Sequence, residues 1–129
     1  LIIEGVTFIP GMTVTVIGTI PDSIDTIQRE HLVRNITVTK VDYELDTVEG
    51  TAEPEVMLDV LVIDEANYYG YPETVLSDST GHWIAEYHSV IDIVPGFSVQ
   101  ISQEDDDGDS TVAFWQRESF SIYLPLIRK

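Results

Sequence analysis

Residues 94–101 read Val-Pro-Gly-Phe-Ser-Val-Gln-Ile, and residues 9–16 read Ile-Pro-Gly-Met-Thr-Val-Thr-Val. Both stretches place a Pro-Gly turn before a run in which apolar and polar residues alternate, which is the two-residue period of a β-strand. The offset from Gly11 to Gly96 is 85 residues. A fixed offset indicates an internal repeat. The same offset relates residues 25–27 to residues 110–112, and residues 35–38 to residues 120–123.

The repeat predicts how the chain is organised. An offset of 85 residues suits a small β-sandwich domain better than a solenoid repeat of roughly 20–50 residues. The chain then contains about one and a half copies of one unit. We expect residues 1–40 to be the second half of a preceding unit, whose strands complete or swap into a sandwich. Residues 41–129 are expected to form one whole unit.

The rest of the chain predicts strands as well. Residues 97–103 alternate most clearly, with Phe97, Val99 and Ile101 on the inward face, and residues 56–63 are apolar enough for a central strand. Residues 23–33 have a loosely helical spacing, but their repeat partner is rich in β-forming residues, so we predict a strand there. Turn signals at short intervals separate these runs, which favours an antiparallel β-sandwich or barrel.

Three segments resemble the bacterial immunoglobulin-like repeats that occur in tandem in extracellular surface and adhesin-type proteins. They are residues 46–54 (Asp-Thr-Val-Glu-Gly-Thr-Ala-Glu-Pro), residues 75–83, which end in Gly-His-Trp, and residues 92–111 with their acidic turn. The resemblance covers roughly residues 34–116. It departs from the family at Glu55, where those repeats carry glycine.

This resemblance implies an all-β fold, an immunoglobulin-like antiparallel β-sandwich with Greek-key connections. It implies a structural or adhesive module on the outside of a bacterial or archaeal cell. We expect Gly50 and Gly81 to allow positive φ or close backbone approach, and Trp83 to fill the space between two sheets. The expected partners are neighbouring modules, other copies of the chain and surface glycans.

Composition narrows the function further. The chain has 23 acidic and 6 basic residues, a formal net charge of −17, and no cysteine. This charge argues against nucleic acid and against an anionic membrane surface, both of which attract clustered Lys and Arg. No apolar run approaches the roughly 20 residues of a membrane span, so we expect no membrane insertion.

One metal site is a candidate. Carboxylates in an acidic turn are the oxygen ligands that Ca²⁺ takes, and Asp105, Asp107 and Asp109 are the first ligands that the sequence offers. The alternative is a solvated hairpin turn with Asp107-Gly108 at its corner. The acidic residues from Asp42 to Asp46 pose the same choice between calcium and an exposed turn. We otherwise expect no cofactor.

Other candidate chemistry is weaker. Tyr68, Tyr69 and Tyr71 form an aromatic loop, either a surface that stacks on sugars or a partner, or a cap on the sandwich. The alternative function is therefore a carbohydrate-binding module. The three histidines lack zinc-site spacing, so we predict surface positions for them. No nucleophile motif is present, and we expect no enzyme.

The ends of the chain are apolar and suggest assembly. Half a sandwich leaves unpaired strand edges, which invite strands from other chains as in donor-strand assembly. We therefore predict that at least one terminal segment pairs as a strand, and that subunits exchange strands to form a filament or array. The expected donors are Leu1, Ile2, Ile3, Leu124, Leu126 and Ile127.

Overall fold

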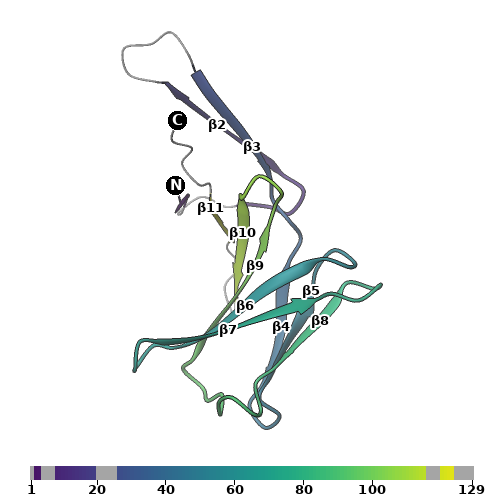
Figure 1. Ribbon diagram of the computed structural model, residues 1–129, viewed down its shortest axis with the longest axis vertical. Coiled ribbons are helices and arrows are strands. Elements are labelled where there is room, and N and C mark those ends of the chain that lie inside the picture. Colours follow the sequence, from purple (N-terminus) through teal and green to yellow (C-terminus); the bar gives the residue numbers. More distant parts are fainter. Residues whose placement is uncertain (1, 4–7, 20–25, 116–119, 124–129) are drawn as a thin grey trace.

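The computed structural model describes residues 2–3, 8–19, 26–115 and 120–123 of the 129-residue chain, and within them every regular element is a β-strand (Figure 1). No described segment forms a helix of the length and apolarity that crossing a membrane requires. The strands are β1 (Ile2–Ile3), β2 (Thr13–Thr19), β3 (Thr26–Leu32), β4 (Thr37–Asp42), β5 (Thr47–Thr51), β6 (Met57–Asp64), β7 (Tyr69–Leu76), β8 (His82–Glu86), β9 (Ser98–Glu104), β10 (Ser110–Phe114) and β11 (Phe120–Tyr123).

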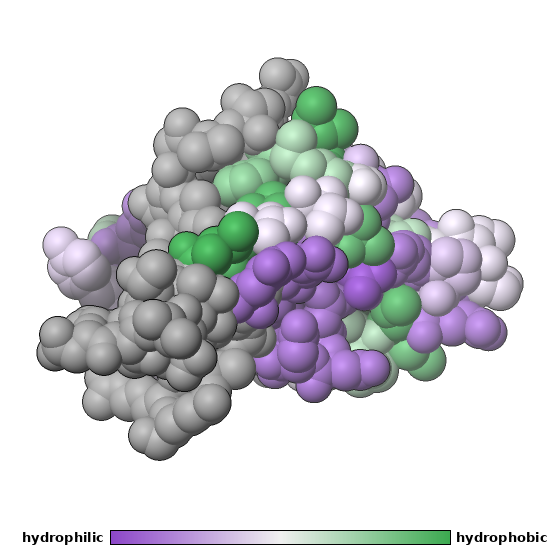
Figure 2. All heavy atoms as spheres, turned by 90° about the horizontal axis from the view of Figure 1, so that it is seen from above, coloured by the Kyte–Doolittle hydropathy of each residue, from purple (hydrophilic) through white to green (hydrophobic). Residues whose placement is uncertain are grey.

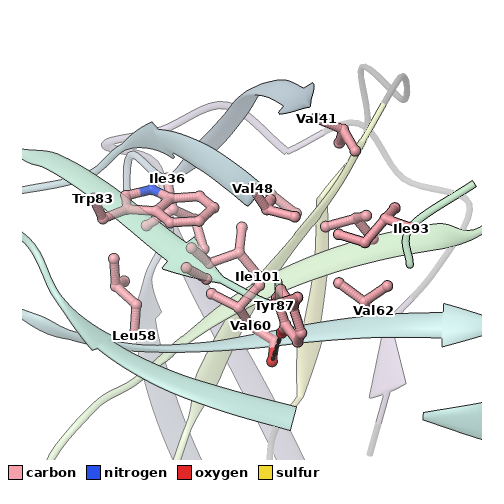
Figure 3. Packing of buried hydrophobic residues seen from close by; sticks show 13 residues of the cluster. Ile36, Val41, Val48, Leu58, Val60, Val62, Trp83, Tyr87, Ile93 and Ile101 are labelled. Atoms are coloured by element: carbon pink, nitrogen blue, oxygen red, sulfur yellow. Dashed lines mark hydrogen bonds between the residues drawn. The ribbon is translucent and has the colours of Figure 1, made fainter. Parts of the chain in front are cut away.

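Two of the three sheets form a sandwich. The larger has the order β1-β11-β10-β9-β6-β7, the smaller has the order β4-β5-β8, and all their pairings are antiparallel. One hydrophobic cluster takes buried side chains from both, so their inner faces pack together (Figure 3). The predicted all-β antiparallel sandwich is confirmed. The Greek-key description stays a prediction.

The core follows from strict alternation along the strands. In β8, Trp83 and Ala85 are buried, whereas His82, Ile84 and Glu86 are exposed. The Trp83 indole lies beside Ile36 in Figure 3, is 1% exposed, and donates its Nε1–H to the Thr51 carbonyl at 3.3 Å. Trp83 therefore fills the space between the sheets, as predicted.

Tyr87, directly after β8, joins the two sheets at the other side of the core. Its ring is fully buried, and its hydroxyl donates to the Tyr71 carbonyl of β7 at 3.1 Å. Desolvation, helped by the negative charge of Glu73, raises the pKa of this phenol. Tyr87 therefore stays a neutral hydrogen-bond donor in the core.

Gly50 is required because backbones approach closely where β4 crosses β5. A Cβ there would overlap the Thr37 carbonyl oxygen and lie 2.7 Å from Cζ2 of Trp83. We expect Gly50→Ala to lower the free energy of unfolding by about 2 kcal/mol, since an overpacked site must shift its neighbours. Gly70→Ala is the matched control, because its Cβ meets only the mobile end of Leu61 at 3.1 Å. Urea unfolding showing equal effects for the two variants would refute this account.

Glu55 shows how the departure from the family pattern is accommodated. Its φ is 57°, so a glutamate holds the left-handed conformation at the position where the similar repeats carry glycine. We expect Glu55→Gly to stabilise the fold by about 0.5–1 kcal/mol, because relief of strain exceeds the added chain entropy. Glu86→Gly, in the extended strand β8, should instead destabilise it. Melting temperatures that fall in both variants would contradict the assignment.

The repeated Pro-Gly stretches form the same local structure. Gly11 has φ 88° and Gly96 has φ 104°, and in each turn the next residue donates its N–H back to residue 9 or 94 (3.0 and 3.2 Å). Each turn leads into a strand that begins a hairpin, β2–β3 in the first copy and β9–β10 in the second. The internal repeat is therefore structural as well as sequential.

The surroundings of the two hairpins differ. β9 is an inner strand of the large sheet, whereas β2 and β3 form a two-stranded sheet with a small cluster of their own around Phe8 and Val33. Figure 1 shows this hairpin projecting beyond the end of the sandwich at which β9 turns into β10. The sequence-based division after residue 40 falls inside β4, and Ile36 already belongs to the core of the sandwich.

Candidate functional site

The polar joint, defined as His31, Arg34, Glu53, Asp105 and Thr111, connects the projecting hairpin to the sandwich. His31 lies near the end of β3 and Arg34 in the link to β4, whereas Asp105 and Thr111 lie at the turn of the β9–β10 hairpin. The joint therefore brings the last part of one repeat copy against the turn of the other.

His31 occupies the buried part of the joint. Its Nε2 lies 2.7 Å from Oγ1 of Thr111, and both residues are 1% exposed or less. Its Nδ1 lies 3.1 Å from Oδ2 of Asp105, within ion-pair distance, although the alignment is too poor for a good hydrogen bond. An attractive contact between imidazole and carboxylate remains, and it strengthens when His31 is protonated.

Arg34 closes the joint from the solvent side. Its Nε and Nη2 reach Oδ1 of Asp105 at 3.0 and 2.8 Å, and its backbone N–H donates to Oγ1 of Thr111 at 3.1 Å. A longer contact of 3.6 Å joins its Nη1 to Glu53. Guanidinium–carboxylate hydrogen bonds are among the stronger polar contacts in proteins, so Arg34 fixes the link between the two parts.

A one-residue slip in register brings His31 inward. In β9–β10, Gln100 lies opposite Phe114, so strict repetition would place Thr15 opposite Arg29. In β2–β3, Thr15 lies opposite Glu30 instead. A slip by one residue exchanges the two faces of a strand. The buried positions in this part of the first hairpin therefore become His31 and Val33.

The order Thr111–His31–Asp105 is that of hydroxyl, imidazole and carboxylate in hydrolase triads. Here Thr111 and His31 are buried, and Oγ1 of Thr111 already accepts the Arg34 N–H. A nucleophile must reach a substrate carbonyl, which this hydroxyl cannot do in the described arrangement. We therefore interpret the three residues as a structural chain of polar contacts.

The acidic turn forms part of this joint. The Asp105 N–H donates to the Asp109 carbonyl at 2.6 Å, the Gly108 N–H donates to the Asp105 carbonyl at 3.0 Å, and Gly108 has φ 86°. The Asp109 N–H lies 3.3 Å from Oδ1 of Asp107. Among the described residues, no group of three or more His, Asp or Glu side chains could hold a metal ion. The turn is the hairpin alternative, and a calcium site there stays a prediction.

Other acidic side chains support their own turns. Oδ1 of Asp42 accepts the N–H groups of Glu44 and Leu45 at 3.0 Å, and Oδ1 of Asp46 accepts the Ile93 N–H at 2.8 Å. The bond from Leu45 is the main cause that lowers the pKa of Asp42. At Asp78, the Thr80 hydroxyl lowers the pKa in the same way. Carboxylates that accept backbone N–H groups stabilise turns without a cation.

The aromatic loop divides into two parts. Tyr68 is 94% exposed at the tip of the β6–β7 hairpin. Tyr69 and Tyr71 pair with their ring centroids 4.8 Å apart, and Tyr71 also packs against the core. The loop is thus partly an exposed tip and partly a cap on the sandwich.

A hollow of about 430 Å³ lies near the same end of the sandwich, away from the joint. Aromatic residues line it together with the Gln100 side chain and with Ser98, whose hydroxyl donates to Glu65. The sequence did not single out this place, because its lining comes from separate turns and strands. Its aromatic residues are Tyr43, Phe97, Phe114 and Trp115.

The histidine prediction was wrong at His31 and correct at the exposed His82 and His88. Nothing in the sequence around His31 predicted burial, because burial depends on the register slip. A different loop length in the two hairpins was the available signal: residues 20–25 separate β2 from β3, whereas residues 105–109 separate β9 from β10.

The predicted assembly residues are only partly described. Ile2 and Ile3 pair antiparallel with Tyr123 and Ile122 of β11 in the same chain, so a terminal segment does pair as a strand. Leu1, Leu124, Leu126 and Ile127 lie outside the described residues. Exchange of these segments between subunits stays a prediction.

Exposed apolar residues are scattered over the surface. On the face drawn in Figure 2, hydrophilic residues and separate apolar groups alternate in the described part of the chain. Scattered apolar residues are normal for a folded surface and mark no interface. Comparison with protein-family models, with curated protein sequences and with solved structures finds no match to this chain.

Proposed function

We propose that the chain is a structural module of a tandem array or filament outside the cell, in which successive β-sandwich units are held at a fixed orientation. The observation that carries this proposal is the polar joint, which fastens a half-copy of the repeat to a complete sandwich. A joint with a buried His31 and a paired Arg34 suits a stiff connection between units better than a flexible linker does.

The strand distribution supports an immunoglobulin-like unit within that array. Strands β4, β5 and β8 face strands β10, β9, β6 and β7, which corresponds to A-B-E opposite G-F-C plus a C′ strand. Such sandwiches serve as repeated spacers and adhesive modules in many surface proteins. The formal charge of −17 supports a role in which the surface stays dissolved and exposed.

The experiment is ¹⁵N relaxation on the whole chain. If the joint is stiff, the β2–β3 amides should tumble with the same correlation time as the sandwich. Arg34→Ala should let the hairpin move faster on the nanosecond scale, whereas Lys40→Ala, which removes an exposed pair with Asp42, should not. A hairpin that tumbles independently in the unmodified chain would refute the array proposal. Surface labelling of intact cells tests the extracellular location.

Carbohydrate binding is a second candidate, favoured by the aromatic hollow with its Gln100 side chain. Sugar rings stack on aromatic faces and use amide and carboxylate groups for their hydroxyls. If a neutral oligosaccharide binds on a glycan array, we expect Tyr43→Ala to weaken it about tenfold when it occupies the hollow. A loss on Tyr69→Ala would place it on the aromatic loop instead. An array without any hit would rule this candidate out.

A further inference from the structure

The two copies of the repeated strand differ in burial in one direction. At each position from Met12 to Ile17, the first copy is more exposed than its counterpart 85 residues later. Val14 and Val16 are half-buried, whereas their counterparts Val99 and Ile101 are 2% and 0% exposed. Because the residue pattern is the same, the difference means that the first copy lacks material that covers the second.

The hydrogen-bonding direction of β9 identifies part of that material. Trp115 donates its N–H to the Val99 carbonyl, so Val99 and Ile101 direct their backbone groups to β10. Hydrogen-bonded positions alternate along an antiparallel strand, so the residues between them direct theirs to β6. These residues and their β6 partners are Ser98 with Ile63, Gln100 with Leu61, and Ser102 with Asp59.

β2 has the same alternation with one edge left over. Val33 donates its N–H to the Met12 carbonyl, so Val14 and Val16 direct their backbone groups to β3. Thr13, Thr15 and Ile17 direct theirs to the outer edge, where no other described strand pairs with β2. These three are the counterparts of the β9 residues that bond to β6.

The sequence of β2 leaves this edge unprotected. Thr-Val-Thr-Val-Ile-Gly-Thr contains no charge and no proline. By contrast, β3 carries Arg29 and Glu30, and the edge strand β7 carries Pro72, devices that commonly block pairing. A two-stranded hairpin with an open edge of this kind is marginal alone and gains stability from a third strand.

We propose that the outer edge of β2 is an acceptor edge for a strand of the β6 type, supplied by the first half of a neighbouring unit of the same repeat. The strand pairs antiparallel with β2, so its equivalents of Ile63, Leu61 and Asp59 lie opposite Thr13, Thr15 and Ile17. The sheet that accompanies it covers Val14 and Val16. This inference rests on the proposed function, because it supplies the part of the array unit that the half-copy lacks.

The test supplies the missing half directly. In a two-unit chain, residues 34–93 are placed immediately before residue 9, which preserves the offset of 85 residues. Amide hydrogen exchange by NMR is compared with that of the original chain. We expect the Thr13, Thr15 and Ile17 amides to exchange about 100-fold more slowly in the two-unit chain.

Proline substitutions provide a matched pair. The Thr15 N–H points to the outer edge, so Thr15→Pro should be tolerated in the original chain and should prevent the slowing in the two-unit chain. The Val16 N–H points to β3, so Val16→Pro should disrupt the hairpin in both chains. Equal damage from both substitutions in the original chain would overturn the assigned direction of the edge.

The outcomes separate this inference from the proposed function. If the added half folds with protected amides but the three edge amides still exchange rapidly, the acceptor edge is refuted and the array proposal stands. If the added half gains no protection at all, both are refuted. If the edge amides of the original chain become protected as its concentration rises, a second copy occupies the edge, and the assigned occupant is wrong.

Discussion

Trp83→Ala is expected to lower the free energy of unfolding by about 3–5 kcal/mol, because it leaves a cavity between the two sheets and removes a large buried side chain. The indole is 1% exposed and also donates a hydrogen bond to the Thr51 carbonyl. Chemical denaturation monitored by circular dichroism measures the loss through the shift in midpoint.

Ile84→Ala is the control for this effect. Ile84 is the next residue in the same strand, but it faces solvent at 42% exposure. Its removal should therefore cost less than about 1 kcal/mol. Similar losses for the two variants would mean that β8 does not present Trp83 to the core, and the assigned faces of the small sheet would be wrong.

Asp105→Ala is expected to lower the free energy of unfolding by about 3 kcal/mol, because Arg34 and His31 both lose their acidic partner in the joint. The Asp105 side chain is only 15% exposed, so water replaces the lost contacts poorly. The amides of β3 should also exchange faster, since the hairpin is then less firmly attached to the sandwich.

Asp106→Ala removes an exposed carboxylate from the same turn and is the control. It should change stability by less than about 0.5 kcal/mol. If Asp105→Ala is as mild as Asp106→Ala, the polar joint does not fasten the hairpin. Hydrogen exchange in β3 that stays unchanged would lead to the same conclusion.

The architecture could be predicted because it depends on local pattern. Alternation in β8 and β9 determined which residues enter the core, and the repeated Pro-Gly turns determined where strands begin. The strand between residues 23 and 33 was also correctly distinguished from a helix, because its repeat partner could be compared with it. These features require no knowledge of which strands are neighbours.

The joint could not be predicted, because it depends on register. Whether His31 or Glu30 faces inward is decided by a one-residue slip between β2 and β3. Arg34 and Asp105 are 71 positions apart, and their contact follows from how the hairpin sits on the sandwich. The acidic turn was read as calcium ligands or as a solvated corner, whereas Asp105 pairs with a cation of the chain itself.

The central claim is that residues 9–33 form half of a repeat unit, which a neighbouring unit completes and the polar joint holds in line. Small-angle X-ray scattering of the two-unit chain tests it most directly. The account predicts a stiff particle of two sandwiches end to end, clearly longer than the original chain, whose profile loosens with Asp105→Ala. A profile of one sandwich carrying an unfolded extension, or of two freely moving units, would contradict it.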